Sequence, residues 1–446
     1  MNAFSFAVAV LTTFICVGYE RETATAADSI TLPPATPLAS DTDQVIATIR
    51  SLEEKVKQNP DDFIAYTKLA GYYLQRQRET GSSDYLSLAS RAARASLAVV
   101  PAERNYSGLA VLAQAEYASH NFAIARDHAL QLTKLASTKS VGLEILSDAL
   151  IELGEYDNAR RILDRMRSLG EKTSGSQSRL GKYALLYGRP KDAVQYLSEA
   201  LVLALEQTPP SRETVAWCRW QLGEIAFSVG DYQTAEHHYR DALVTFPDYY
   251  RALAGLARVR AALGDWPGAM AQYEQVVRIL PDPTFVAALG DLYQLAGREK
   301  DATVQYALVE QIARLSTLSG TLYNRQLALF YADHDRNPEE AYANAAKEYT
   351  VRRDIYGADA VAWTALKAGK LIEAQVVMKE ALRLGTRDAR IFYHAGMIAY
   401  RHGEREKAKH YLHLALETNP YFSRSGAEQA RQTLAALANE RTIKAK

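Results

Sequence analysis

The segment Asp333-His334-Asp335 places two carboxylates and an imidazole side by side, and these side chains can bind a divalent metal ion. Adjacent residues in a turn seldom converge on one ion, and polar turn residues usually cap helices. The segment therefore leaves two interpretations open: a metal-binding or enzymatic loop, and a simple capping turn.

A second group with ligand chemistry is His410, His413 and Glu417, which share one face at helical spacing. We expect that face to be the outer, solvated one, so a surface role is the competing interpretation. His237 and His238 are adjacent and point to different sides of a helix. The sequence contains no Gly-rich phosphate loop, no H-E-x-x-H, no G-x-S-x-G and no paired cysteines. We therefore expect no cofactor and no catalytic residue.

Small residues recur along the chain at a nearly constant interval. Six of the eight intervals between successive members of an alanine series are 33 or 34 residues long. The series is Ala125, Ala159, Ala193, Ala235, Ala269, Ala302, Ala341, Ala374 and Ala408. The two longer intervals contain the segments 206–213 and 315–321, which we expect to be insertions between repeats.

A second series lies five residues before these alanines and is expected to form a turn between two helices. Its members are His120, Gly154, Gly188, Gly230, Gly264, Gly297, Gly369 and Gly403. Glycine there supplies the positive φ that such a turn needs. Small residues on the preceding helix should let the second helix cross closely; they are Gly181, Gly223, Ala257, Gly290 and Gly396. A larger residue would cost about 1–3 kcal/mol.

One repeat shows the full pattern, in Val286, Leu289, Gly290, Tyr293, Gly297, Ala302 and Tyr306. This resembles the tetratricopeptide repeat signature W-x2-L-G-x2-Y…A-x3-F, with Val for Trp and Tyr for Phe. The resemblance covers roughly residues 62–420. It implies an all-α, right-handed superhelical α-solenoid of about ten helix–turn–helix units, closed by a C-terminal capping helix. The unit around Leu329 to Ala341 departs from the pattern, with Leu at the small position and no turn glycine.

The C-terminal half is also similar to a group of exported bacterial repeat proteins without an assigned activity. The similarity is carried by the segments 332–335, 384–389 and 393–398. This similarity implies an exported location and a repeat architecture, and it does not imply a particular activity.

The N-terminus differs in character from the repeats. Ala3 to Val17 is apolar apart from three hydroxyl residues, and Ala24-Thr25-Ala26 offers a cleavage site. We expect residues 1–27 to be a cleaved signal that exports the protein to the periplasm, the cell envelope or the medium. An uncleaved anchor is the alternative, because the segment before the apolar run lacks Lys and Arg.

The expected order after the signal is a Pro/Thr-rich linker at 28–40, an N-terminal helix within 41–60 and the repeat array at 61–421. A capping helix and tail follow at 422–446. With the signal removed, Cys218 is the one cysteine left, and we interpret it as a small packed hydrophobe.

The charge balance bears on the class of partner. Lys and Arg number 52, as do Asp and Glu, and a dedicated nucleic-acid binder normally has a basic excess. We therefore expect a protein or peptide partner, no nucleic acid and no membrane span in the mature chain. The oligomeric state is not indicated.

The partner-binding surface is expected on the concave face of the array, lined by the first helix of each repeat. Alignment on the turn glycines places ten residues there: Trp217, Trp220, Glu224, Phe227, Arg251, Arg258, Asp291, Trp363, Tyr393 and Tyr400. Aromatic and Arg side chains are frequent at interface hot spots, although some of these aromatics could instead pack between repeats. The sharpest candidate is the group Trp217, Trp220 and Phe227 beside Arg251 and Arg258.

Three functions follow from these observations. The first is a non-catalytic scaffold that holds a peptide or protein in the groove. The second is a structural component of an envelope machine that exports polysaccharide or an appendage. The third is a metal-binding or enzymatic role that uses Asp333-His334-Asp335.

Overall fold

The computed structural model describes residues 30, 32–319 and 324–444, without the side chains of 316–319, 324 and 440–444. The expected signal at 1–27 lies outside the described residues. The chain divides into two parts, Met1–Thr31 and Leu32–Lys446, and the second holds all the described helices.

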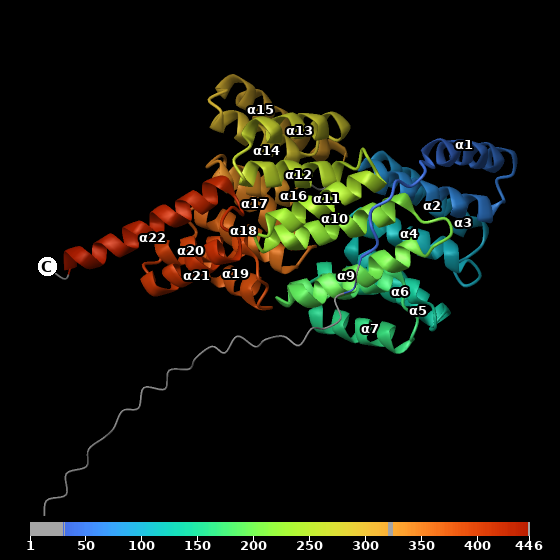
Figure 1. Ribbon diagram of the computed structural model, residues 1–446. Coiled ribbons are helices and arrows are strands. Elements are labelled where there is room, and N and C mark those ends of the chain that lie inside the picture. Colours follow the sequence, from blue (N-terminus) through green and yellow to red (C-terminus); the bar gives the residue numbers. More distant parts are fainter. Residues whose placement is uncertain (1–29, 31, 320–323, 445–446) are drawn as a thin grey trace, which may run out of the picture. The chain divides into compact units, whose positions relative to one another are not determined.

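The described residues form helices and no strands (Figure 1). The helices are α1 (Thr42–Gln58), α2 (Phe63–Thr80), α3 (Asp84–Val99), α4 (Tyr106–Ala118), α5 (Phe122–Leu135), α6 (Ser140–Glu152), α7 (Tyr156–Ser168), α8 (Ser174–Leu186), α9 (Pro190–Leu205), α10 (Arg212–Ser228), α11 (Tyr232–Thr245), α12 (Tyr250–Ala262), α13 (Trp266–Ile279), α14 (Pro283–Leu295), α15 (Glu299–Ser319), α16 (Asn324–Asp333), α17 (Pro338–Tyr349), α18 (Ile355–Lys367), α19 (Leu371–Leu382), α20 (Ala389–Arg401), α21 (Arg405–Thr418) and α22 (Arg424–Lys444). Consecutive helices from α2 to α21 make ten helix–turn–helix repeats, with α1 before them and α22 after them. The predicted all-α solenoid is confirmed.

Short polar side chains define where many of these helices begin. Side-chain oxygens accept a hydrogen bond from a backbone N–H of the first turn at Asp62, Asn105, Thr173, Ser211, Asp231, Asp265, Asp282, Asp354 and Asp388. Such caps satisfy donors that have no partner within the helix.

The core of each repeat depends on the small residues that the sequence repeats. All nine alanines of the predicted series are at most 3% exposed. A Cβ on Gly223 would lie 2.5 Å from a ring carbon of Tyr239, and one on Gly290 would lie 2.6 Å from Tyr306. Each of these tyrosines belongs to the second helix of the same repeat, so the predicted close crossing is confirmed.

The turns also follow the prediction. All eight residues of the predicted turn series have positive φ, from 61° at His120 to 86° at Gly264. In the repeat of α16 and α17, which lacks the glycine, Asp335 (φ 50°) and Asn337 (φ 42°) take this conformation.

The two expected insertions differ from each other. The first is a loop, since α9 ends at Leu205 and α10 begins at Arg212. The second was expected at 315–321, but α15 continues as helix through Ser319, and residues 320–321 lie outside the described residues. The extra residues before that point therefore lengthen a helix.

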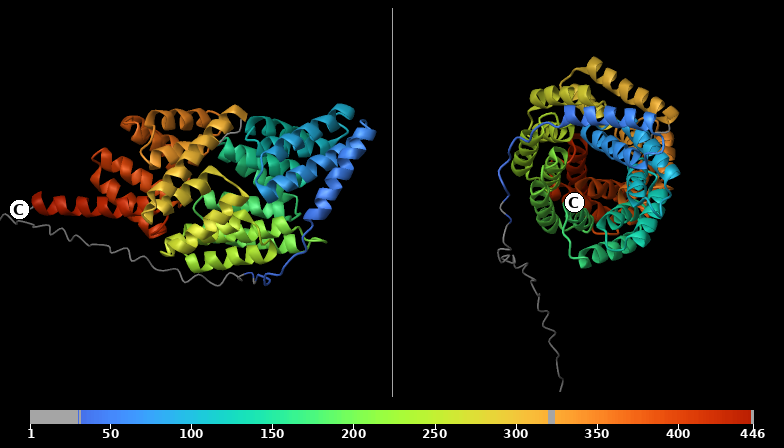
Figure 2. Two further views of the ribbon diagram at one scale, coloured as in Figure 1. Left: turned by 90° about the horizontal axis from the view of Figure 1, so that it is seen from above. Right: turned by 90° about the vertical axis from the view of Figure 1, so that its right-hand side faces the viewer.

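Repeats that are far apart in the sequence contact each other directly. The Ile355 backbone N–H donates to Tyr156 Oη over 2.8 Å, and Asn419 Nδ2 donates to the carbonyl of Phe227 over 2.7 Å. These partners are 199 and 192 residues apart in the chain. The array from Leu32 onward therefore folds back on itself about six repeats later, which Figure 2 shows from two directions.

The contacts between distant repeats have a regular geometry. The turns at Gly154, Gly188 and Gly230 each lie against the link that precedes α18, α20 and α22, respectively. The neighbours in those links are Arg353, Gly385 and Pro420. Because a side chain would fill the space, glycine at these turns serves both the turn conformation and the contact.

The linker after the expected signal packs against the array. Residues 32–40 form no helix, and Leu32 and Leu38 contact the apolar core between α9 and α10. The carbonyl of Pro33 accepts a hydrogen bond of 3.1 Å from Arg219, which is 1% exposed and also bonds Asp241.

Cys218 lies in the same core and is fully buried. Burial raises the pKa of its thiol to about 12. This confirms its interpretation as a packed hydrophobe. Across the described stretches of the chain, no helix is long and apolar enough to cross a membrane.

Candidate protein-interaction surface

Six of the predicted groove residues come together on α10 and α12, and we call this group the α10–α12 patch. Its members are Trp217, Trp220, Glu224, Phe227, Arg251 and Arg258. The four α10 residues are three or four positions apart, so they share one face of that helix. Trp217 and Trp220 are half-buried and contact the core through part of their rings, which leaves the remaining ring surface open.

Arg258 is held by groups of the chain itself. Its guanidinium donates to Glu224 and, over 3.1 Å, to Tyr239 Oη, and it lies 4.4 Å from the ring centre of Phe227. Burial disfavours its charge, but Glu224 and Tyr239 outweigh burial and raise the pKa of Arg258. The structure thus uses Arg258 to join α10, α11 and α12, and it covers Phe227, which is buried.

Arg251 is placed differently. Its guanidinium lies 5.1 Å from the Trp220 ring centre and 5.0 Å from that of Tyr250. It makes no ion pair with any carboxylate in the part of the chain that the structure describes. The two rings therefore orient a cation that Glu213 and Asp282 attract electrostatically without forming an ion pair with it.

The predicted Asp291 lies outside this patch, on α14. It is exposed and accepts hydrogen bonds of 2.8 Å from Tyr306 Oη and 2.7 Å from His334 Nε2. Asp291 therefore anchors the turn after α16 to α14.

Trp363 and Tyr393 form a second group near the C-terminal end of the array. Trp363 is 2% exposed and donates its indole N–H to Asp333 over 2.8 Å. Tyr393 is buried and donates its hydroxyl to Gln429 of α22. Burial of these two rings favours the alternative that they pack between repeats, since α22 and the α16–α17 turn lie against them. Tyr400 is half-buried on the same helix as Tyr393.

The three side chains of Asp333-His334-Asp335 turn to three different partners. Asp333 binds Trp363, His334 binds Asp291, and Asp335 binds Lys367 over 2.6 Å. This geometry favours the capping and tethering interpretation over convergence on one ion.

The other candidate ligand group also does not form a metal site. His410, His413 and Glu417 are exposed on α21, as expected for an outer face. Within the described ranges, no three His, Cys, Asp or Glu side chains are grouped so that they could hold a metal ion.

Comparison with known proteins agrees with this architecture. Residues 221–282, which contain most of the α10–α12 patch, match the tetratricopeptide repeat family model. The chain contains tetratricopeptide repeats. Tetratricopeptide arrays act as protein-interaction scaffolds in general, and this tetratricopeptide repeat protein has that general character.

Individual relatives are similar to only part of this chain. A probable biofilm formation methyltransferase, WspC of Pseudomonas putida, is 40% identical over 74 residues, which is 17% of this chain and 16% of that protein. The crystal structure of MamA is similar over 39% of this chain and 96% of that one, at 21% identity and a TM-score of 0.32. A tetratricopeptide repeat protein from Parabacteroides merdae is similar over 59% and 98%, at 16% identity and a TM-score of 0.34.

The sequence analysis missed a charge network around the buried Glu152 that includes a residue of a distant repeat. Glu152 of α6 accepts hydrogen bonds from Lys182 over 3.0 Å and from Arg352 over 2.6 Å. Burial would raise the pKa of Glu152, and the two cations outweigh it and lower that pKa below its usual range. A signal for Lys182 existed, since it lies one repeat after Glu152. No local pattern indicates Arg352, which is 200 residues away.

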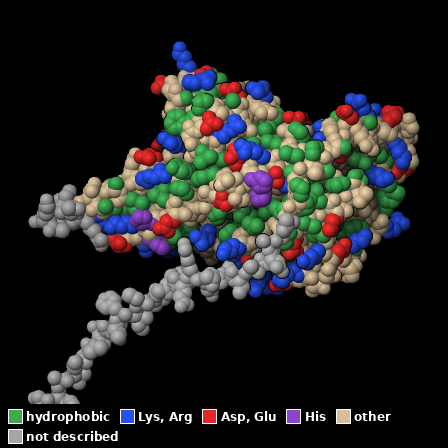
Figure 3. All heavy atoms as spheres, in the orientation of Figure 1, with side chains coloured by type: hydrophobic (Ala, Val, Ile, Leu, Met, Phe, Trp, Pro, Cys, Tyr) green, Lys and Arg blue, Asp and Glu red, His purple; other side chains and the backbone are tan. Residues whose placement is uncertain are grey.

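Surface charge elsewhere is mixed. Figure 3 shows Lys and Arg interspersed with Asp and Glu and with apolar side chains on the face in view. This agrees with the equal numbers of basic and acidic residues in the sequence.

Proposed function

We propose that this tetratricopeptide repeat protein is a non-catalytic scaffold that binds a peptide or protein partner at the α10–α12 patch. The observation that carries the proposal is that Arg251 lies near the rings of both Trp220 and Tyr250 and makes no ion pair with a carboxylate of the described residues. In this arrangement, an acidic side chain of the partner binds Arg251 while an apolar one packs on Trp217 and Trp220.

The chemistry of the patch supports this division of roles. An Arg guanidinium offers paired donors that match a carboxylate, and these hydrogen bonds are among the stronger ones in proteins. Contact with the two rings restricts the Arg251 side chain before the partner arrives, which lowers the entropy lost on binding. Aromatic and Arg side chains also supply most of the energy at typical interfaces.

Arg258 has a supporting role in this proposal. Its removal would leave Glu224 without its ion-pair partner beside the buried Tyr239. An Arg258→Ala variant would therefore mix loss of fold with loss of binding, so Arg251 gives the cleaner test.

The test uses a partner isolated by cross-linking to the wild-type chain in its native cells and then purified. Titration calorimetry should show at least about tenfold weaker binding, or 1.4 kcal/mol, for Trp220→Ala and for Arg251→Ala. Arg251→Lys should be weakened to an intermediate degree, because it keeps the charge and loses the planar fork.

The matched control is Arg240→Ala. Arg240 is an exposed arginine of α11 that pairs with Glu236 of its own helix. Its affinity should equal that of the wild type, and all variants should have the wild-type circular dichroism. Unchanged affinity in both Trp220→Ala and Arg251→Ala would show that the partner binds elsewhere.

A further inference from the structure

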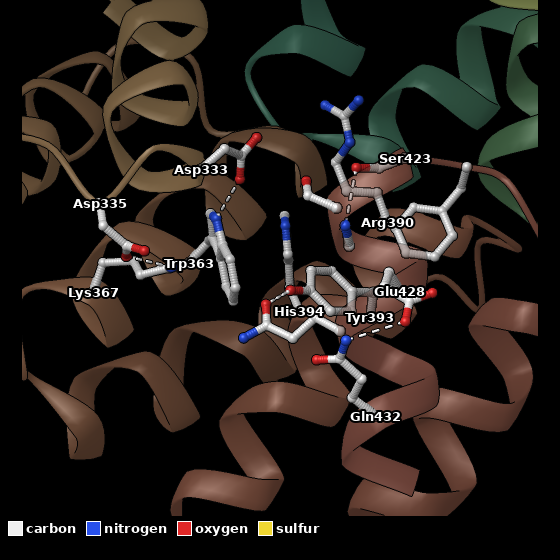
Figure 4. Close-up of a pocket in the computed structure, with 14 residues that line it drawn as sticks. Asp333, Asp335, Trp363, Lys367, Arg390, Tyr393, His394, Ser423, Glu428 and Gln432 are labelled. Atoms are coloured by element: carbon white, nitrogen blue, oxygen red, sulfur yellow. Dashed lines mark hydrogen bonds and ion pairs between the residues drawn. The ribbon is translucent and has the colours of Figure 1, made fainter. Parts of the chain in front are cut away.

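A cavity of about 350 Å³ lies near the C-terminal end of the array, and we call it the C-terminal pocket. Its walls include Asp333 from the α16–α17 turn, Trp363 of α18, Tyr393 and His394 of α20, and Gln429 of α22 (Figure 4). Its volume is within the range of pockets that hold small ligands or single side chains.

His394 has hydrogen-bonding capacity that the fold does not use. It is 1% exposed, it stacks on Trp363 with ring centres 4.2 Å apart, and its Nδ1 lies 2.8 Å from Asp359 Oδ1. Because the Asp359 carboxylate can only accept, Nδ1 carries a hydrogen, and in the Nδ1–H tautomer Nε2 is an acceptor. Nε2 has no hydrogen-bond partner among the residues that the structure describes, and His394 lines the pocket.

Asp333 supplies a negative charge beside this acceptor. It accepts the indole N–H of Trp363 and makes no ion pair within the described part of the chain. Its neighbour Asp335, in contrast, is paired with Lys367 over 2.6 Å. Burial and the charges of Asp333 and Asp335 raise the pKa of the Tyr393 hydroxyl, as expected where the local potential is negative.

The remaining cation at the pocket, Arg390, does not occupy this position. Figure 4 shows its charged end extending away from Tyr393 and Gln432, whereas Asp333 and the ring of His394 flank Trp363. The inner part of the pocket thus presents the Asp333 carboxylate, His394 Nε2 and aromatic rings, while the Lys367 ammonium, 4.9 Å from the Trp363 ring centre, is paired with Asp335. This combination suits a positively charged donor rather than an anion.

We propose that the C-terminal pocket binds a basic side chain, arginine or lysine, of the partner that the scaffold holds. The cationic group donates to Asp333 and to His394 Nε2, and its alkyl stem packs on Tyr393. This proposal rests on the proposed scaffold function and adds a second contact to the one at Arg251. The partner would then carry an acidic group for α10–α12 and a basic group for this pocket.

The experiment uses the full chain and a small probe, so it does not depend on partner capture. N-acetyl-arginine amide is titrated while the indole N–H resonance of Trp363, assigned with Trp363→Phe, is followed by NMR. We expect a saturable shift with this probe and none with N-acetyl-citrulline amide, which has the same shape without the charge.

Asp333→Asn keeps an oxygen for the Trp363 indole and removes the charge, so it should bind the arginine probe at least about tenfold more weakly. Glu339→Gln is the control, since it removes an equal charge from an exposed position that pairs with Lys370; its affinity should be that of the wild type. The absence of a shift, an equal response to citrulline, or wild-type affinity in Asp333→Asn would each overturn the proposal. Failure here with weakened partner binding in Arg251→Ala would leave the scaffold function standing.

Discussion

At the scale of single residues, the array depends on large aromatic rings that pack against glycines of neighbouring helices. The ring of Tyr239 lies where a Cβ on Gly223 or on Gly255 would be, at 2.5 and 2.7 Å from the nearest ring carbon. Its hydroxyl meanwhile donates to Glu224 over 2.7 Å. One tyrosine thus joins three helices, and its position requires both glycines.

This arrangement predicts opposite effects for two Gly→Ala substitutions within helices. Gly223→Ala should lower the free energy of unfolding by about 1–3 kcal/mol, because Tyr239 must move. Gly71→Ala in α2 should raise it by about 0.5–1 kcal/mol, because alanine favours the helix and no atom lies within 4 Å of its Cβ. Chemical denaturation of both variants tests this, and shifts of the same sign would contradict it.

At the scale of elements, the turn inside each repeat fixes how two helices meet. Seven of the eight predicted turn residues are glycines, and the eighth is His120 with φ 61°. Its ring stacks on that of Phe122 with ring centres 5.4 Å apart, and the Arg352 guanidinium lies 5.5 Å from the Phe122 ring centre. Burial and the charge of Arg352 lower the pKa of His120 to about 4.

His120 should therefore make the fold sensitive to acid. Above its ordinary pKa of 6.5 both the folded and unfolded states hold it neutral, so its contribution is complete. Between pH 6.5 and about 4 the unfolded chain binds a proton at His120 that the folded chain does not. The free energy of unfolding therefore decreases as the pH is lowered through this range. His120→Asn, which tolerates positive φ, should flatten this dependence.

The measurement is thermal unfolding as a function of pH. His410→Asn is the control, since His410 is exposed on α21. Its pH profile should run parallel to that of the wild type. A parallel profile for His120→Asn would show that folding does not lower the pKa of His120.

At the scale of the whole repeat array, direct contacts join pairs of repeats that are about six repeats apart in the chain. They limit how far the array can extend. They include hydrogen bonds from the Ile355 N–H to Tyr156 and from Asn419 to the Phe227 carbonyl. Each is backed by a turn glycine against a link, as at Gly154 and Arg353. A repeat protein whose units touch only their neighbours lacks such cross-links.

Comparing two turn glycines with the same φ separates the effect of the turn conformation from the effect of the contact between distant repeats. Gly154 and Gly369 both have φ 74°, so alanine at either should cost about 1–2 kcal/mol for the left-handed conformation. Only at Gly154 does the added Cβ also meet the Arg353 carbonyl, whereas nothing lies near Gly369. The free energy of unfolding of Gly154→Ala should therefore be lower than that of Gly369→Ala by a further ~1–3 kcal/mol.

Small-angle X-ray scattering supplies a second readout of this comparison. Gly154→Ala should increase the radius of gyration, and Gly369→Ala should not. Equal stabilities and equal radii would show that the contact between distant repeats does not hold the array closed.

How much of the candidate surface could be predicted is clear from Arg251 and Arg258. They are seven positions apart on α12 and so share one face of that helix, which the repeat alignment predicts without coordinates. It cannot show that Glu224 and Tyr239 bind Arg258 directly, whereas Arg251 lies over the rings of Trp220 and Tyr250 and makes no ion pair among the described residues. That difference depends on side-chain directions in neighbouring helices, which have no period in the sequence.

The sequence by itself determined the repeat, the turns and the buried alanines, because each of these follows from contacts between residues less than one repeat apart. Backbone conformation at Gly230 or burial at Ala235 depends only on such local geometry. Only the tertiary structure decided that Tyr156 meets Ile355, that Glu152 meets Arg352 and that α22 covers Tyr393. Those contacts depend on small rotations between repeats that accumulate over several units, and no single repeat contains that information.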